Sequence, residues 1–178
     1  MKFARRNKKA VIWVSTVIYT LIGLSVIALL LAVVRPKIAE MKDSFIISQT
    51  ISALNELDDA ITEIRQAPGN TRRYDLYLSR GELRIYPNES VIEWHLSDSY
   101  FRYSELDMPY QAGDIRAITR KSDDRFAVTL TLDYSYLDIT FDGLREEKLL
   151  QPAKTPYILF LENKGLRIDK QWIDITLA

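Results

Sequence analysis

An uncharged and mostly apolar segment runs from Ala10 to Val34, directly after a tail that carries basic residues and no acid. A hydrocarbon layer offers the backbone no hydrogen-bonding partner, so a chain that crosses it must form a helix, and about 20 apolar residues span a layer of about 30 Å. Because positive charges resist translocation, we expect the tail, residues 1–9, to stay in the cytoplasm. The sequence therefore predicts a transmembrane helix over residues 10–34 and an extracytoplasmic remainder.

The apolar pattern continues after this segment with a helical spacing. Apolar residues recur at steps of three or four and include Ile51, Leu54, Leu57, Ile61 and Ile64. This stripe predicts an amphipathic helix over residues 35–67, with Asp43 on its polar face. Pro36 predicts a kink or a short break, and Pro68 ends the helix. We expect the stripe from Ile51 onward to cover a sheet, and residues 38–47 to face the membrane or neighbouring helices.

From residue 68 to residue 178 the apolar residues alternate with polar ones, which is typical of half-buried strands. Turn residues divide the pattern into about eight strands. The first three strands read as a meander, and residues 162–165 read as a turn. The predicted fold class is α+β: a long N-terminal transmembrane plus amphipathic helix, followed by an antiparallel β-sheet, sandwich or small barrel. We expect this β-rich part to be one extracytoplasmic domain.

The composition narrows the chemistry that this chain can perform. It has no cysteine, which excludes disulfides and thiolate metal sites, and its single histidine, His95, cannot by itself build a zinc site. Its 24 basic and 24 acidic residues balance, so we expect no nucleic-acid partner. We expect three acidic pairs, at residues 58–59, 123–124 and 146–147, to be solvated surface. The sequence therefore predicts no catalytic residues, no cofactor and no metal.

Two features of the β-rich part are candidate sites. Four aromatic residues crowd one irregular stretch: Tyr100, Phe101, Tyr103 and Tyr110. Two interpretations of this cluster stay open, a contact with a partner and a cap over the open end of the core. The triplet Asn88-Glu89-Ser90 is an N-glycosylation sequon in a predicted turn, which makes Asn88 a candidate glycosylation site.

The N-terminal region resembles a known class of membrane proteins. The basic stretch Arg5-Arg6-Asn7-Lys8-Lys9-Ala10 before the apolar run from Val11, followed by an amphipathic helix and a β domain, is similar to archaeal type IV pilin-like proteins with a class III signal peptide. The resemblance implies a prepilin peptidase that cuts between Ala10 and Val11, and apolar helices that bundle with those of other subunits. The chain has Ser15 where bacterial pilins usually have Glu.

Two functions are hypotheses for a chain with this layout. The first is a structural, pilin-like subunit at the cell surface, anchored in the membrane by its N-terminal helix and assembled into a filament through other pilin-like helices. The second is a single-span anchored β module that binds a partner within a surface or secretion complex. The sequence identifies neither the ligand or partner nor the strand order.

Overall fold

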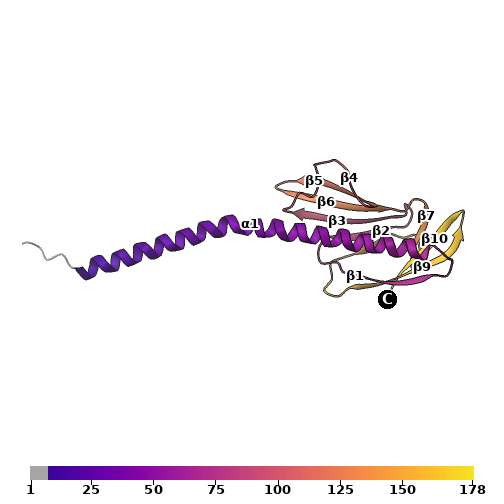
Figure 1. The fold of residues 1–178 in the computed structure, drawn as a ribbon, viewed down its shortest axis with the longest axis horizontal. Helices are drawn as coiled ribbons and strands as arrows, with labels where there is room; N and C mark the ends of the chain where they lie inside the picture. Colours follow the sequence, from indigo (N-terminus) through magenta and orange to yellow (C-terminus); the bar gives the residue numbers. More distant parts are fainter. Residues whose placement is uncertain (1–7) are drawn as a thin grey trace, which may run out of the picture. The chain divides into compact units, whose positions relative to one another are not determined.

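The computed structural model describes the backbone of residues 8–178 and the side chains of residues 13–178. One helix, α1, spans Lys8–Ile64 and continues through Pro36 (Figure 1). Of the two alternatives predicted at Pro36, the short break is therefore wrong, and the kink stays a prediction. A proline inside a helix removes one backbone hydrogen bond, but good helix formers such as Ala39, Glu40 and Met41 follow it and sustain the helix.

The chain divides between Ala39 and Glu40 into two compact units. The first is the apolar part of α1. The second comprises the last part of α1 and all the strands, and it has a core of its own.

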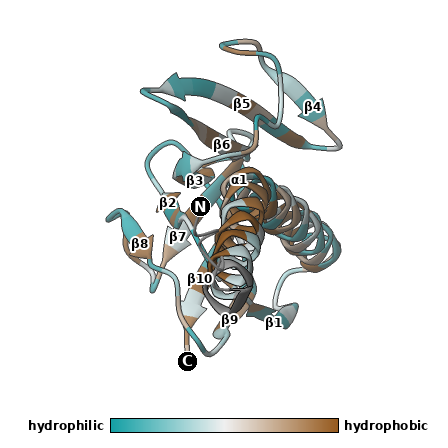
Figure 2. Cartoon of the chain, turned by 90° about the vertical axis from the view of Figure 1, so that its left-hand side faces the viewer, coloured by the Kyte–Doolittle hydropathy of each residue, from teal (hydrophilic) through white to brown (hydrophobic). Residues whose placement is uncertain are grey.

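The strands of the second unit confirm the predicted α+β class, with antiparallel pairing dominant. Their bounds are β1 Thr71–Leu76, β2 Glu82–Tyr86, β3 Val91–Ser99, β4 Tyr110–Ala112, β5 Ile115–Ser122, β6 Arg125–Asp133, β7 Leu137–Phe141, β8 Lys148–Leu150, β9 Tyr157–Arg167 and β10 Lys170–Leu177. They form a four-stranded sheet in the order β1-β9-β10-β7 and a six-stranded sheet in the order β4-β5-β6-β3-β2-β8. Figures 1 and 2 show β3, β5 and β6 on one side of the C-terminal part of α1, and β1 and β9 on the other.

The connectivity differs from the predicted meander. β2 pairs with β3 as expected, but β1 leaves them and pairs with β9 in the other sheet. β7 pairs in parallel with β10, so the sheet is mixed. The predicted meander is therefore wrong, although all three of its segments are strands. Alternation of apolar residues indicates that a segment is a strand but does not indicate which strand pairs with it.

The predicted turn at residues 162–165 is also wrong, because β9 runs through it to Arg167. The register of β9 against β10 shifts between Trp172 and Ile173, opposite Gly165, whose φ is +98°. A glycine within a strand often marks such a bulge. The chain turns instead at Ile168 and Asp169, which both have positive φ.

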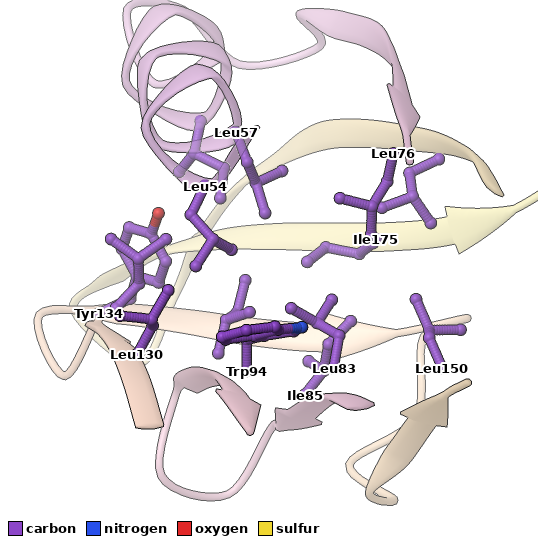
Figure 3. Close-up of a cluster of buried hydrophobic side chains, with 14 of the residues drawn as sticks. Leu54, Leu57, Leu76, Leu83, Ile85, Trp94, Leu130, Tyr134, Leu150 and Ile175 are labelled. Carbon is purple, nitrogen blue, oxygen red and sulfur yellow. The ribbon is translucent and has the colours of Figure 1, made fainter. Parts of the chain in front are cut away.

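The core of this unit lies between α1 and the two sheets (Figure 3). Leu54 and Leu57 of α1 point toward Trp94, Leu83 and other side chains of the six-stranded sheet. All four side chains are buried. The prediction that the helix from about Ile51 onward covers a sheet is confirmed, although it covers two sheets and not one.

Ser90, in the turn between β2 and β3, ties the two sheets together. Its backbone oxygen accepts a hydrogen bond from the N–H of Tyr134 at 2.9 Å. Its hydroxyl donates to the carbonyl oxygen of Leu137 at 3.0 Å and accepts from the N–H of Ile139 at 3.3 Å. Because Leu137 and Ile139 belong to β7, this one buried serine joins the six-stranded sheet to the edge of the other.

The C-terminal end of α1 is fixed to β9 and β10 by two amide side chains. Asn163, which is fully buried, donates from Nδ2 to the carbonyl oxygens of Ile64 and Ala67 at 3.1 and 3.2 Å. Gln171 donates from Nε2 to the carbonyl oxygen of Arg65 at 2.9 Å. The last carbonyls of a helix have no partner within the helix, so these side chains supply donors to the carbonyls of Ile64 and Arg65, whereas that of Ala67 also accepts from the N–H of Asn70.

Candidate functional site

The apolar part of α1 is the first candidate site. Between Trp13 and Val34 its large apolar side chains are exposed, and among the described residues this is the one helix long and apolar enough to cross a membrane. Soluble proteins rarely expose so much contiguous apolar surface, which marks an interaction with lipid or with other proteins. The predicted single apolar helix is therefore present, close to the N-terminus.

Two polar side chains of this segment, those of Thr20 and Ser25, form hydrogen bonds within the helix. The Thr20 hydroxyl donates to the carbonyl oxygens of Thr16 and Val17 at 2.8 and 2.9 Å. The Ser25 hydroxyl donates to the carbonyl oxygen of Leu21 at 2.8 Å. Back-bonded hydroxyls need no water, so these residues suit a hydrocarbon environment or a dry contact between helices.

The predicted cleavage point lies at the very start of α1. Ala10 and Val11 both belong to the helical backbone, which begins at Lys8. Arg5, Arg6 and Asn7 of the basic stretch lie outside the described residues.

The helix surface before Ile51 is only partly as predicted. Met41 and Phe45 are 67% and 68% exposed, in agreement with an apolar surface that no strand covers. Ile47, however, is fully buried in the core, so the expectation that it faces lipid or other helices is wrong. Successive residues of a helix point about 100° apart, so two positions suffice to turn the side chain from Phe45 to the opposite side.

Asp43, which the sequence places on the polar face of the helix, is instead 1% exposed. Its carboxylate forms an ion pair with Arg80, and its Oδ2 accepts a hydrogen bond from the N–H of Tyr100 at 2.7 Å. Arg80 also donates to the carbonyl oxygen of Asp98 at 2.9 Å. A buried carboxylate requires such partners, and no local pattern indicates them, because Arg80 and Tyr100 are distant along the chain.

The aromatic cluster is split by the fold. Phe101 and Tyr103 pack against the core, whereas Tyr100 and Tyr110 are 41% and 54% exposed. The rings of Tyr103 and Tyr110 meet edge to face at 6.0 Å between centroids. The guanidinium of Arg125 lies over the ring of Tyr100 at 3.3 Å from its centroid. Phe101 and Tyr103 are therefore partly buried against the core, whereas Tyr100 and Tyr110 expose more of their side chains to solvent.

Asn88 lies where the sequence predicts it, exposed in the turn between β2 and β3. The hydroxyl of Ser90, the third residue of the sequon, is buried in the junction of the two sheets. The folded turn therefore presents the asparagine to solvent but not the serine.

One acidic pair departs from the expected solvated surface. Asp58 is half-buried, and its Oδ1 accepts a hydrogen bond from the hydroxyl of Tyr134 at 2.8 Å. Burial raises the pKa of the Asp58 carboxyl, the Tyr134 hydrogen bond opposes that rise, and the nearby Asp114 carboxyl adds to it. Burial and the charge of Asp58 also raise the pKa of Tyr134. The other acidic pairs are exposed, as predicted.

His95 is half-buried on β3, and its Nδ1 lies 3.1 Å from the hydroxyl oxygen of Thr129 on the neighbouring strand. This contact packs His95 against the neighbouring strand. Over the part of the chain that the structure describes, no three acidic or histidine side chains come together in a way that could hold a metal ion.

Comparisons with known protein families, with curated proteins and with solved structures return no match for this chain.

Proposed function

We propose that this protein is a membrane-anchored, pilin-like structural subunit of the cell surface, with the apolar part of α1 in the bilayer and the β domain outside it. The observation that supports the proposal most strongly is the exposed apolar surface between Trp13 and Val34. Contact of so large an apolar surface with water is unfavourable, so lipid or other protein must cover it. Basic residues precede this segment, and we infer from them that the N-terminus is cytoplasmic. We propose no catalytic activity.

The same helix serves two states in this proposal. Before assembly, lipid covers it. After cleavage between Ala10 and Val11 by a prepilin peptidase, its apolar surface packs against helices of identical or related subunits. Gly23 supports close packing, because it has no side chain and lies on an open surface, with no atom within 4 Å of the position that a Cβ would take. Small residues let helix backbones approach each other closely in a bilayer.

A second candidate function is an anchored binding module that stays a single-span protein. The exposed rings of Tyr100 and Tyr110 favour it, because tyrosines are common in interfaces. The two functions differ in the fate of the N-terminus.

Mass spectrometry of the mature N-terminus, from protein isolated in its native membrane, separates the two functions. A first residue of Val11 supports the pilin-like subunit. An intact Met1 supports the anchored module and contradicts processing.

Cysteine cross-linking tests assembly directly, because the chain has no cysteine of its own. The variant Gly23→Cys places the only thiol on the apolar helix, and Tyr77→Cys places it on the exposed surface of the β domain. We expect cross-linked dimers for Gly23→Cys in assembled material and fewer for Tyr77→Cys. Equal yields for the two variants would contradict helix-mediated assembly.

Membrane anchorage has its own test. Leu24→Arg introduces a charge into the middle of the apolar segment, at a cost of about 3 kcal/mol on the insertion scale, and should shift the protein out of the membrane fraction. The matched variant Tyr77→Arg should stay in the membrane. A Leu24→Arg protein that fractionates like the parent would argue against a spanning helix.

A further inference from the structure

The four sheet edges of the β domain are covered to very different degrees. β4 and β8 are edges of only three residues each. β7 is closed off, because the N–H of Ile139 donates to the Ser90 hydroxyl and that of Phe141 donates to the carbonyl oxygen of Leu144. β1 pairs with β9 along its six residues, and no strand in the described part of the chain pairs with its other side. β1 is thus the one long open edge in this part of the molecule.

The backbone groups on this open edge can be assigned from the ladder. The N–H of Asn163 donates to the carbonyl oxygen of Asn70 at 2.9 Å, immediately before β1, and the register continues with Arg72 opposite Leu161. In an antiparallel pair, successive residues alternately face the partner strand and face away from it. Three residues of β1 therefore direct both their N–H and their C=O outward: Thr71, Arg73 and Asp75.

A groove of about 510 Å³ borders this edge. One wall is α1, with Glu56, Asp59 and Ala60, and the other is β1 from Arg72 to Asp75. The hydroxyl of Tyr74 donates to the carbonyl oxygen of Ala53, which holds the strand beside the helix. Figure 2 shows β1 beside α1 at the rim of its sheet. An added strand would lie with one face toward this wall of α1 and the other toward solvent.

The charges of the groove do not balance. Arg72 forms an ion pair with Glu63, and Arg73 forms one with Asp75 at 2.8 Å. Both basic residues of the groove are therefore neutralised locally. Glu56 and Asp59 are exposed on the helix wall, and neither makes an ion pair with a described cation. A segment lying in the groove therefore meets two uncompensated carboxylates on its inward face.

We propose that β1 and the groove beside it form a docking site for an extended segment of a partner protein that carries Lys or Arg at alternate positions. The segment adds to the four-stranded sheet as a new edge strand. Hydrogen bonds to Thr71, Arg73 and Asp75 hold its backbone, and Glu56 and Asp59 select its inward-facing cations. Charged residues on an edge strand discourage uncontrolled pairing, so Arg73 and Asp75 also restrict which segments can bind. This site acts independently of helix assembly.

The experiment uses the full chain in micelles of a neutral detergent and two short synthetic peptides. Lysine alternates with valine in one, and glutamate alternates with valine in the other. We expect the lysine peptide to bind and to slow hydrogen exchange at the amides of Thr71, Arg73 and Asp75. The amide of Tyr74, which already faces β9, is the internal control and should change little. Failure of the lysine peptide to bind the unaltered protein would overturn the proposal.

Two variants at one position separate the backbone from the side chain. Arg73→Pro removes the outward N–H without removing a bond to β9, whereas Arg73→Ala keeps the N–H and loses only the side chain. We expect binding of the lysine peptide to weaken about tenfold in Arg73→Pro and much less in Arg73→Ala. Equal affinities for these two variants would exclude strand addition at β1. Thermal unfolding establishes that both variants are folded.

The charge selection is tested without altering the backbone, which keeps the proposal testable if Arg73→Pro does not fold. The double variant Glu56→Gln, Asp59→Asn should lose the preference for lysine over glutamate, whereas Glu146→Gln, on another exposed surface, should retain it. A preference that survives the double variant contradicts the proposed role of the groove.

Self-association at β1 is a separate outcome of the exchange experiment. If protection of the β1 amides rises with protein concentration in the absence of peptide, a second copy of the chain occupies the edge, and this result would also overturn the proposal.

Discussion

Gly81 is the position at which the packing of the core can be tested most sharply. Its φ is +73°, and a Cβ placed on it would lie 2.6 Å from the indole of Trp94. That indole cannot easily move, because it is fully buried and its Nε1 donates to the carbonyl oxygen of Arg80 at 3.0 Å. The variant Gly81→Ala is therefore destabilised twice, by the positive φ at this position and by a steric clash between its Cβ and the indole of Trp94.

Gly143 provides a matched control. Its φ is +74°, almost the same, but a Cβ placed there would meet nothing within 4 Å. An alanine in this conformation costs about 1 kcal/mol, whereas overpacking of a core adds about 2 kcal/mol. We expect Gly143→Ala to lower the free energy of unfolding by about 1 kcal/mol and Gly81→Ala to lower it by about 3 kcal/mol.

The assay is urea unfolding of the full chain in a mild detergent, followed by circular dichroism of the strands. The free energy of unfolding and its dependence on urea are fitted for the parent and for both variants. The difference between the variants isolates the clash, since the two share the backbone penalty. Equal destabilisation would mean that the indole of Trp94 yields at no cost and that the reasoning about this core is wrong.

Three further predictions concern polar groups. Folding raises the pKa of the Asp58 carboxyl above its ordinary value of 3.8, so the folded state binds this proton more tightly and the free energy of unfolding should fall as pH rises above about 4. Urea titrations at several pH values should show a flatter pH dependence for Asp58→Asn than for the parent. An unchanged pH dependence would contradict the role of Asp58. Asn163→Ala leaves the carbonyl oxygen of Ile64 without its donor, whereas that of Ala67 keeps the N–H of Asn70, so the variant should cost about 2 kcal/mol by urea unfolding. The exposed Asn88→Ala should cost less than about 0.5 kcal/mol. A cost of Asn163→Ala below about 1 kcal/mol would show that the Ile64 carbonyl finds another donor. Asp43→Asn should lower the free energy of unfolding by about 2 kcal/mol, whereas Asp59→Asn on the exposed surface should change it little. Similar changes in the free energy of unfolding for both variants would show that burial of Asp43 is unimportant.

The sequence is sufficient for the features that a local pattern determines. The apolar helix and the stripe that contains Leu54 and Leu57 are local repeats, and the structure places both as expected. Most strands are also recognisable from alternation. Even the helix end can be predicted from Pro68 and Gly69, because these residues cannot easily continue a helix.

The features that sequence reasoning misses depend on contacts between distant residues. The sequence pattern places Asp43 on the solvent-facing side of the helix, but the fold brings Arg80 and Tyr100 into contact with it. The pairing of β1 with β9 joins segments separated by most of the β domain. Of the candidate site residues, Phe101 and Tyr103 differ from Tyr100 and Tyr110 in burial, and burial cannot be predicted from an irregular stretch of sequence.

The attachment of α1 through Asn163 and Gln171 has a mechanical consequence. These residues lie on β9 and β10, the two central strands of the four-stranded sheet. A pulling force along the end of the helix is therefore passed to these two central strands through side-chain hydrogen bonds, as well as to β1, the edge strand that follows α1 in the chain. Separation of the helix end from the sheet therefore requires the hydrogen bonds of Asn163 and Gln171 to break in addition to those that hold β1.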